Sequence, residues 1–114
     1  MELPFFLIAR NAAPALVTGN TIVIKPSEET RSNAVKFCEL LQELGIAPGI
    51  INVVHGRGPT TGKALASSAR GGLVSFTGSV ETGSAIMRAA VENSTKVNLE
   101  LGGKAPAIVM GDAI

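Results

Sequence analysis

A carboxylate and two glycines stand together at the end of an apolar run in the segment LELGGKAP, residues 99–106. Glu100 lies between two leucines, where a charge is costly to bury unless a partner or a reaction uses it. Gly102 and Gly103 let the backbone pass close to another molecule. Glu100 could act as a general base or proton relay if partial burial raised its pKa toward neutrality. The alternative is a carboxylate paired with a neighbour such as Lys104.

A lysine, a serine and a glutamate follow the short β-branched run TIVIK in the segment KPSE, at Lys25, Ser27 and Glu28. Ligands of open parallel sheets bind at the carboxyl ends of the strands. The ammonium and carboxylate groups there could hydrogen-bond ribose hydroxyls. The alternative is a surface turn, in which Pro26 ends the strand and Ser27 or Thr30 caps the following helix.

A third candidate lies in SFTGSVETG, where an apolar run leads into Gly78 and Ser79 and then into a helical pattern. The free amides and the dipole of a helix start favour a bound phosphate. The alternative is that Ser79 is an ordinary helix cap. The preceding segment GRGPTTG, residues 56–62, is glycine-rich but is not a P-loop, because no Gly-Lys-Ser/Thr follows at the required distance.

The single cysteine and the single histidine do not indicate a catalytic centre by themselves. Cys38 lies between Phe37 and Leu41 on the apolar stripe of a predicted helix, so we expect a buried thiol with a raised pKa that behaves as a small hydrophobe. His55 follows a predicted strand and has no nucleophile evident near it. One cysteine also excludes an intrachain disulfide and a zinc site built from cysteines.

Strand-like and helical patterns alternate along the whole chain, as in βαβ units. We therefore expect an α/β fold, with a parallel sheet buried on both faces under helices. Pro14 should kink or shorten the first helix. The predicted helices are 4–17, 30–44, 60–69 and 80–92, and the predicted strands are 21–25, 51–54, 73–76, 97–101 and 107–110.

Composition limits the remaining possibilities. The 114 residues suffice for one domain with a modest core, and 46% of them are apolar. With four Phe, no Trp, no Tyr and a net charge of +1, the chain has neither stacking platforms nor a basic patch for nucleic acid or an anionic membrane. The opening apolar run is too short to span a bilayer and does not read as a signal peptide, so we expect a cytoplasmic protein.

The segments PFFLIARNAAPALVTGNTIVIKPSE, FTGS and LELGGKAP, in this order and spacing, resemble the aldehyde dehydrogenase superfamily, and its lactaldehyde and glycolaldehyde dehydrogenase members in particular. The resemblance implies a Rossmann-like parallel sheet with helices on both faces, which binds NAD or NADP. It further implies that residues 1–114 are a single, partial NAD(P)-binding domain and that the catalytic domain is absent. The resemblance also implies that the full-length members of the superfamily are homo-oligomers.

The resemblance also implies a role for individual residues. Lys25 and Glu28 match the positions that hold the adenosine ribose, and Ser79 matches one beside the pyrophosphate. Glu100 matches the general base that activates water to hydrolyse a thioester intermediate, and Arg10 matches a position that helps to hold small hydroxyaldehyde substrates. The full set implied to contact the cofactor is Lys25, Ser27, Glu28, Gly78, Ser79, Val80, Thr82, Gly83, Leu101 and Gly102.

Two departures from the family pattern bear on activity. The family's nucleophilic cysteine follows the LELGGK segment, whereas Cys38 precedes it, so the expected nucleophile lies beyond Ile114. Glu2 stands where the family has an asparagine that stabilises an oxyanion. We therefore expect an NAD(P)-dependent oxidation of a small aldehyde to a carboxylic acid, in which this chain supplies the nucleotide cradle and the base but is inactive alone. The alternative is a non-catalytic nucleotide-binding or vestigial fragment. Glu28 favours NAD because it would oppose a 2′-phosphate, while Lys25 leaves NADP possible.

Overall fold

The computed structural model describes residues 4–103, and its elements follow the predicted alternation of helices and strands. The predicted strand 107–110, Lys104 and Glu2 lie outside the described residues. The elements are α1 (Pro4–Val17), β1 (Ile22–Ile24), α2 (Arg31–Glu43), β2 (Ile51–Val53), η1 (Gly58–Gly62), α3 (Lys63–Ala66), β3 (Leu73–Gly78), α4 (Val80–Val91) and β4 (Lys96–Leu101).

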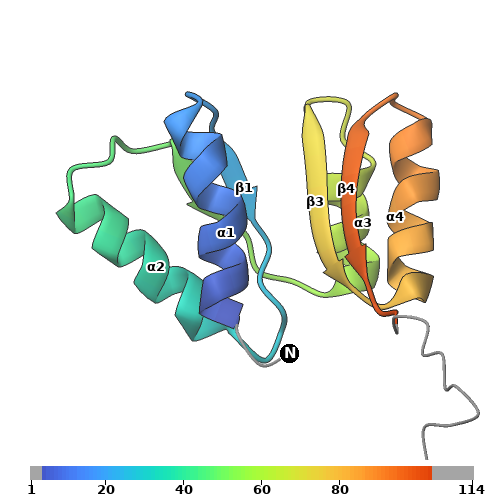
Figure 1. Cartoon of the computed structure of the whole chain (residues 1–114), viewed down its shortest axis with the longest axis horizontal. Helices are drawn as coiled ribbons and strands as arrows, with labels where there is room; N and C mark the ends of the chain where they lie inside the picture. The colour runs from blue at the N-terminus through green and yellow to red at the C-terminus, as the bar shows by residue number, and fades with distance from the viewer. Residues whose placement is uncertain (1–3, 104–114) are drawn as a thin grey trace, which may run out of the picture.

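The four described strands form two parallel pairs (Figure 1). β1 pairs with β2 and β3 pairs with β4, with Ile22 opposite Ile51 and Leu73 opposite Lys96. Each pair is linked by one helix, as a parallel connection requires, because its strands cannot be joined by a tight turn. The α/β class with parallel strands is thus confirmed. The expected single sheet is seen as two hydrogen-bonded pairs within residues 4–103.

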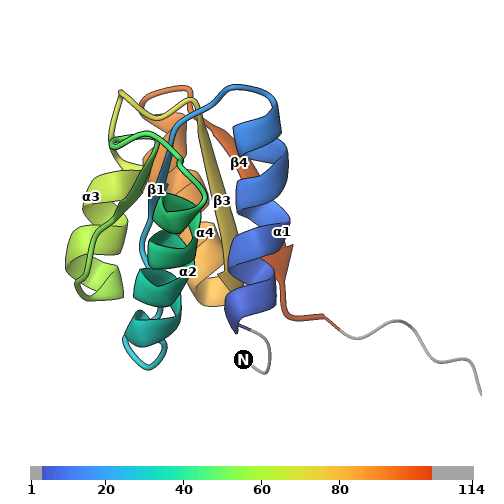
Figure 2. The ribbon, with the colours of Figure 1, turned by 90° about the vertical axis from the view of Figure 1, so that its left-hand side faces the viewer.

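Helices cover the strands from two sides, as predicted. α1 packs against β1 and α2, whereas α4 packs against α3, β3 and β4. Figure 2 shows α1 and α3 on opposite sides of the strands. The Ser75 hydroxyl, on β3, donates a hydrogen bond of 2.9 Å to the Asn11 side chain of α1. This contact ties α1 to the side of the β3–β4 pair that is opposite to α4.

The first helical pair is held by a few apolar residues. Ala34 and Phe37 are the buried residues of α2, and the ring of Phe37 meets Phe5 of α1 edge-on, with centroids 5.5 Å apart. Gly45 follows α2 with a φ of +84°, the left-handed conformation in which glycine commonly ends a helix. α1 continues through Pro14 to Val17, so the expected shortening of this helix is not observed.

Two local expectations differ from the structure. The chain forms a single π-helical turn, η1, and the four-residue helix α3 where one helix over 60–69 was predicted. Exposure alternates along β4, so this strand is not buried on both faces. The composition of β4 agrees with this alternation, because Lys96, Asn98 and Glu100 occupy alternate positions, and such polar groups are costly to bury fully. None of the helices within residues 4–103 has the length and apolar composition needed to cross a bilayer.

Candidate functional site

The candidate residues follow the strand ends. Lys25 comes directly after β1, Ser79 directly after β3, and Glu100 is the penultimate residue of β4. The Gly102 amide donates to the Gly78 carbonyl at 3.2 Å, so β3 and β4 end in register. Figure 1 shows α1 beginning at the same end of the molecule at which β3 and β4 finish. Parallel pairing therefore brings Ser79 and Glu100 to the same end of the β3–β4 pair, whereas Lys25 follows the separate β1–β2 pair.

Lys25 and Glu28 form a charged pair in the β1–α2 loop. The Lys25 ammonium lies 3.8 Å from Glu28 Oε1 and donates to the Pro26 carbonyl at 2.8 Å. Glu28 Oε1 also accepts a hydrogen bond of 3.0 Å from the Gly58 amide at the start of η1. The Ser27 hydroxyl accepts from the Glu29 amide, which makes it part of the turn. The loop thus presents a carboxylate and an ammonium group beside η1.

The environment of Glu28 lowers the pKa of its carboxyl group below the ordinary value of 4.5. The largest cause is a hydrogen bond from its own backbone amide, followed by the attraction of Lys25, with the Gly58 amide adding to both. The side chain is therefore ionised near neutral pH and can accept hydrogen bonds from hydroxyl groups. Sequence reasoning set aside the segment around Gly58 because it is not a P-loop. The glycines of this segment could have indicated that its backbone amides are accessible to a side chain such as Glu28.

Ser79 caps α4 in the predicted manner. Its hydroxyl oxygen accepts from the Thr82 amide at 3.2 Å, and its proton is directed to the Thr82 hydroxyl at 3.0 Å. The amides of Val80 and Glu81 precede the first intrahelical bond and point outward from the helix start. Glu81 places a negative side chain in the same turn. The helix start thus offers amide donors beside an acidic group.

The glycines assigned to this region have a packing explanation in the structure. A Cβ at Gly78 would lie 2.5 Å from the Phe76 ring, and one at Gly83 would lie 2.4 Å from a methyl group of Leu101. Gly83 is buried, so α4 can approach β4 closely over Leu101. In contrast, a Cβ at Gly102 would meet nothing within 4 Å, so the backbone there is open to approach.

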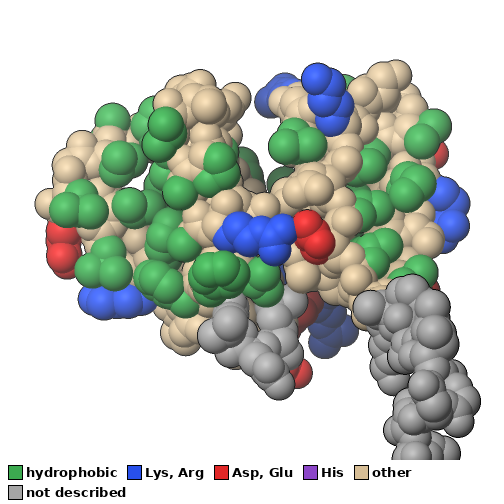
Figure 3. Space-filling model, viewed as in Figure 1, with side chains coloured by type: hydrophobic (Ala, Val, Ile, Leu, Met, Phe, Trp, Pro, Cys, Tyr) green, Lys and Arg blue, Asp and Glu red, His purple; other side chains and the backbone are tan. Residues whose placement is uncertain are grey.

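Glu100 is paired with a distant arginine. Arg10 Nη2 of α1 donates to Glu100 Oε1 at 2.6 Å, and both side chains are about half exposed, at 46% and 51%. The Glu100 carboxylate therefore lies at the surface of the described residues, beside the Arg10 guanidinium group. Figure 3 shows basic and acidic side chains in contact where the two halves of the molecule meet. The contact joins the predicted base to the predicted substrate-binding residue.

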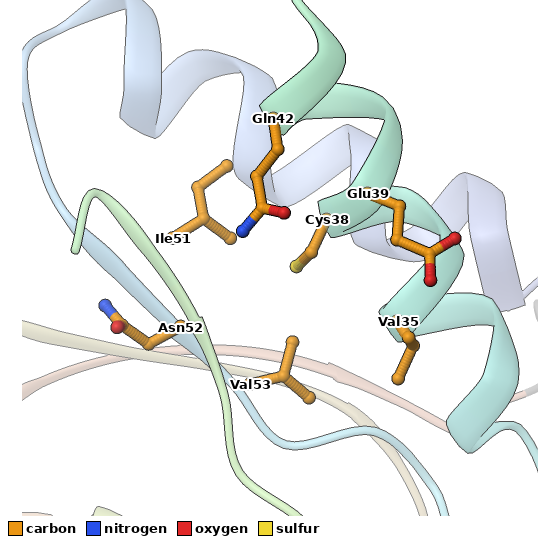
Figure 4. Close-up of a pocket in the computed structure, with 7 residues that line it drawn as sticks. All are labelled: Val35, Cys38, Glu39, Gln42, Ile51, Asn52 and Val53. Atoms are coloured by element: carbon orange, nitrogen blue, oxygen red, sulfur yellow. The ribbon is translucent and has the colours of Figure 1, made fainter. Parts of the chain in front are cut away.

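The structure does not place the candidate residues in one described cavity. A hollow of about 310 Å³ lies between α2 and β2 and contains Cys38, whose thiol points toward β2 (Figure 4). Partial burial raises the pKa of this thiol above 9.0, as expected for a structural cysteine. A second hollow of about 350 Å³ lies between α1 and the β3–β4 pair. Neither hollow is lined by Lys25, Glu28, Ser79 or Glu100.

Comparison with known proteins identifies the family. The sequence model described as the aldehyde dehydrogenase family matches residues 2–113. The chain belongs to the aldehyde dehydrogenase family. It is 60% identical over 112 residues to lactaldehyde dehydrogenase of Escherichia coli, which covers 98% of this chain and 23% of that relative. It is 45% identical over 113 residues to mouse retinaldehyde dehydrogenase 3, with 22% of that relative covered.

Solved aldehyde dehydrogenases share the fold of the described residues. A crystal structure of lactaldehyde dehydrogenase from Escherichia coli superposes on 90% of this chain and 22% of its own, with a TM-score of 0.86 and 58% identity. Betaine aldehyde dehydrogenase from Staphylococcus aureus in complex with NAD+ gives a TM-score of 0.85 at 42% identity, over 88% of this chain and 20% of its own. The chain thus spans less than a quarter of the relatives that it matches.

Proposed function

We propose that this chain forms part of the NAD(P)-binding domain of an enzyme that oxidises an aldehyde to a carboxylic acid, with residues 1–114 supplying nucleotide contacts and the general base. The observation that carries the proposal is the Lys25–Glu28 pair at the end of β1, held beside the Gly58 amide. Family membership and relatives solved with NAD supply its context.

The donor set of the described residues fits a dinucleotide. An ionised Glu28 can accept from vicinal ribose hydroxyls, and Lys25 can donate to them. The free amides at the start of α4, next to Ser79, are suited to a pyrophosphate oxygen. Val80 and Thr82 lie on the same first turn, and Leu101 and the open backbone of Gly102 lie beside Glu100 for the nicotinamide end. When bound, the nicotinamide ring accepts the hydride.

Glu100 is the group of this chain that handles a proton. Its carboxylate would take a proton from the water that hydrolyses the acyl intermediate, and its half-exposed position at the strand end lets water reach it. Arg10 would hold an oxygen of the substrate. Cys38 faces β2 in a hollow that contains none of these residues, so we assign the attacking thiol to another part of the enzyme.

The cofactor is proposed to be NAD, with NADP weaker. A 2′-phosphate on the ribose would bring a negative charge to Glu28, which disfavours it, whereas Lys25 offsets part of that repulsion. We also propose a cytoplasmic, homo-oligomeric enzyme with no nucleic-acid or membrane partner. The composition of the chain supports the location and the absence of these partners, and the family supports the oligomeric state.

Calorimetric titration of the chain with NAD tests the proposal. We expect binding that weakens at least roughly tenfold in Lys25→Ala and Glu28→Ala, since each removes a charge-assisted hydrogen bond. Lys36→Ala is the matched control, because Lys36 also pairs with a glutamate three residues on, at 3.1 Å, but on the exposed side of α2. A flat titration of the unmodified chain, or equal affinities for all three variants, contradicts the proposal.

A further inference from the structure

The Arg10–Glu100 contact joins two elements that come from different halves of the molecule. Arg10 belongs to α1, which packs against β1 and α2, while Glu100 belongs to β4, which packs against β3 and α4. Within residues 4–103, each of the two side chains takes part in one ion pair, and it is this one. Both are about half exposed. A small molecule in solution can therefore reach the pair.

Glu100 and an anionic ligand would compete for the same donor of Arg10. A guanidinium group presents its N–H donors in a fixed fork that matches the oxygens of a carboxylate. In the structure one nitrogen of this fork, Nη2, donates to Glu100 Oε1 at 2.6 Å. A ligand oxygen that accepts from Nη2 must displace Glu100. The glutamate thus stands where the oxygen of a ligand would stand.

We propose that a ligand that binds Arg10 releases Glu100 from its ion pair. A small molecule with a negatively charged or strongly polar oxygen accepts hydrogen bonds from the guanidinium group, and the freed carboxylate can then contact water. This inference rests on the proposed function, since it concerns the base assigned there. It adds that the base is held by Arg10 until the substrate-side oxygen arrives, which couples occupation of the site to the availability of the base.

The strength of the pair suits such an exchange. Ion pairs between exposed side chains contribute little to stability, because water screens them and side-chain freedom is lost. A ligand can therefore compete with Glu100, but removal of this internal competitor should have a measurable effect. The energies typical of exposed pairs correspond to a gain in ligand affinity of roughly two- to five-fold when the carboxylate is neutralised.

The experiment uses glycolate as the probe and the whole chain at one constant pH. NMR spectra follow the side-chain N–H signals of Arg10 and the carboxyl carbon signal of Glu100 during the titration. We expect both signals to move together in the unmodified chain. We expect Glu100→Gln to bind glycolate roughly two- to five-fold more tightly, and Arg10→Gln to lose binding. Arg88→Gln, which removes an exposed arginine of α4, is the matched control and should leave the affinity unchanged.

Three outcomes overturn the proposal. These are an unchanged affinity in Glu100→Gln, glycolate binding in Arg10→Gln equal to that of the unmodified chain, and a Glu100 signal that does not respond while Arg10 binds glycolate. A loss of structure in a variant is recognised from its backbone amide spectrum, and Arg10→Lys then serves as the second variant, with weakened binding expected. If the chain binds glycolate as expected but does not bind NAD, the nucleotide assignment is contradicted, whereas the displacement of Glu100 from Arg10 is not.

Discussion

Ser79 allows the structural and the ligand-binding roles of one side chain to be separated. Its hydroxyl accepts from the Thr82 amide at 3.2 Å, whereas Thr30, at the equivalent position of α2, makes no side-chain cap bond. We therefore expect Ser79→Ala to lower the free energy of unfolding by about 1 kcal/mol, the usual value of a helix cap. For a chain of this size, that loss corresponds to a fall of roughly 4–8 °C in Tm. Thr30→Ala should change stability much less, because no cap bond is lost.

The assay is urea unfolding followed by circular dichroism, combined with NAD titration. Ser79→Asp keeps an acceptor for the Thr82 amide and adds a charge that the helix dipole favours, so its stability should equal or exceed that of the unmodified chain. The same charge would repel a phosphate, so NAD affinity should fall at least roughly tenfold. Equal destabilisation by Thr30→Ala would refute the cap argument. Undiminished NAD binding by Ser79→Asp would refute the phosphate assignment.

Two further predictions concern the segment around Gly56 and the charge of Glu28. Gly56 has a φ of +152°, and a Cβ there would lie 1.8 Å from the Thr61 hydroxyl oxygen. Gly56→Ala should lower the free energy of unfolding, measured by thermal unfolding, by about 1–3 kcal/mol. Gly58→Ala should change it little, because nothing lies within 4 Å of the added Cβ. Similar losses in both variants would contradict the geometry. Because the folded pKa of Glu28 is below 4.5, its stabilising contribution is present above pH 4.5 and is lost as pH falls through the lowered value. The Gly58 amide signal in NMR should shift only below about pH 4.5, and not at all in Glu28→Gln; a shift between pH 5 and 7 in the unmodified chain would exclude the predicted charge state.

Local sequence signals predicted the elements of this fold well. The β-branched run at 22–24 is short and bounded by Gly19-Asn20 and Pro26, and it forms β1. Ser79 was identified as a cap because it precedes an apolar periodic stretch, and the structure shows the bond. Cys38 was expected on an apolar stripe, and burial raises its pKa as predicted. In each case the signal and the structure involve residues within one turn or strand.

Expectations that depended on distant residues were less successful. The structure pairs Glu100 with Arg10, ninety residues earlier, and sequence analysis did not predict this partner. The Gly58 amide that supports Glu28 is thirty residues away. Such contacts arise from the tertiary packing of segments far apart in the sequence, which no local pattern encodes. The short π-helical turn at Gly58–Gly62 was likewise missed, because glycine and proline suggest a break without specifying its geometry.

The arrangement of the strands in two pairs bears on how the chain loses its structure. Each pair and its connecting helix come from one continuous stretch, 22–53 and 73–101. Such stretches can open as separate cooperative units. The first has strands of three residues and the second has strands of six, so amide protons of β1 and β2 should exchange with deuterium sooner than those of β3 and β4. A single melting midpoint would then average two events, and probes placed in each stretch would report them separately.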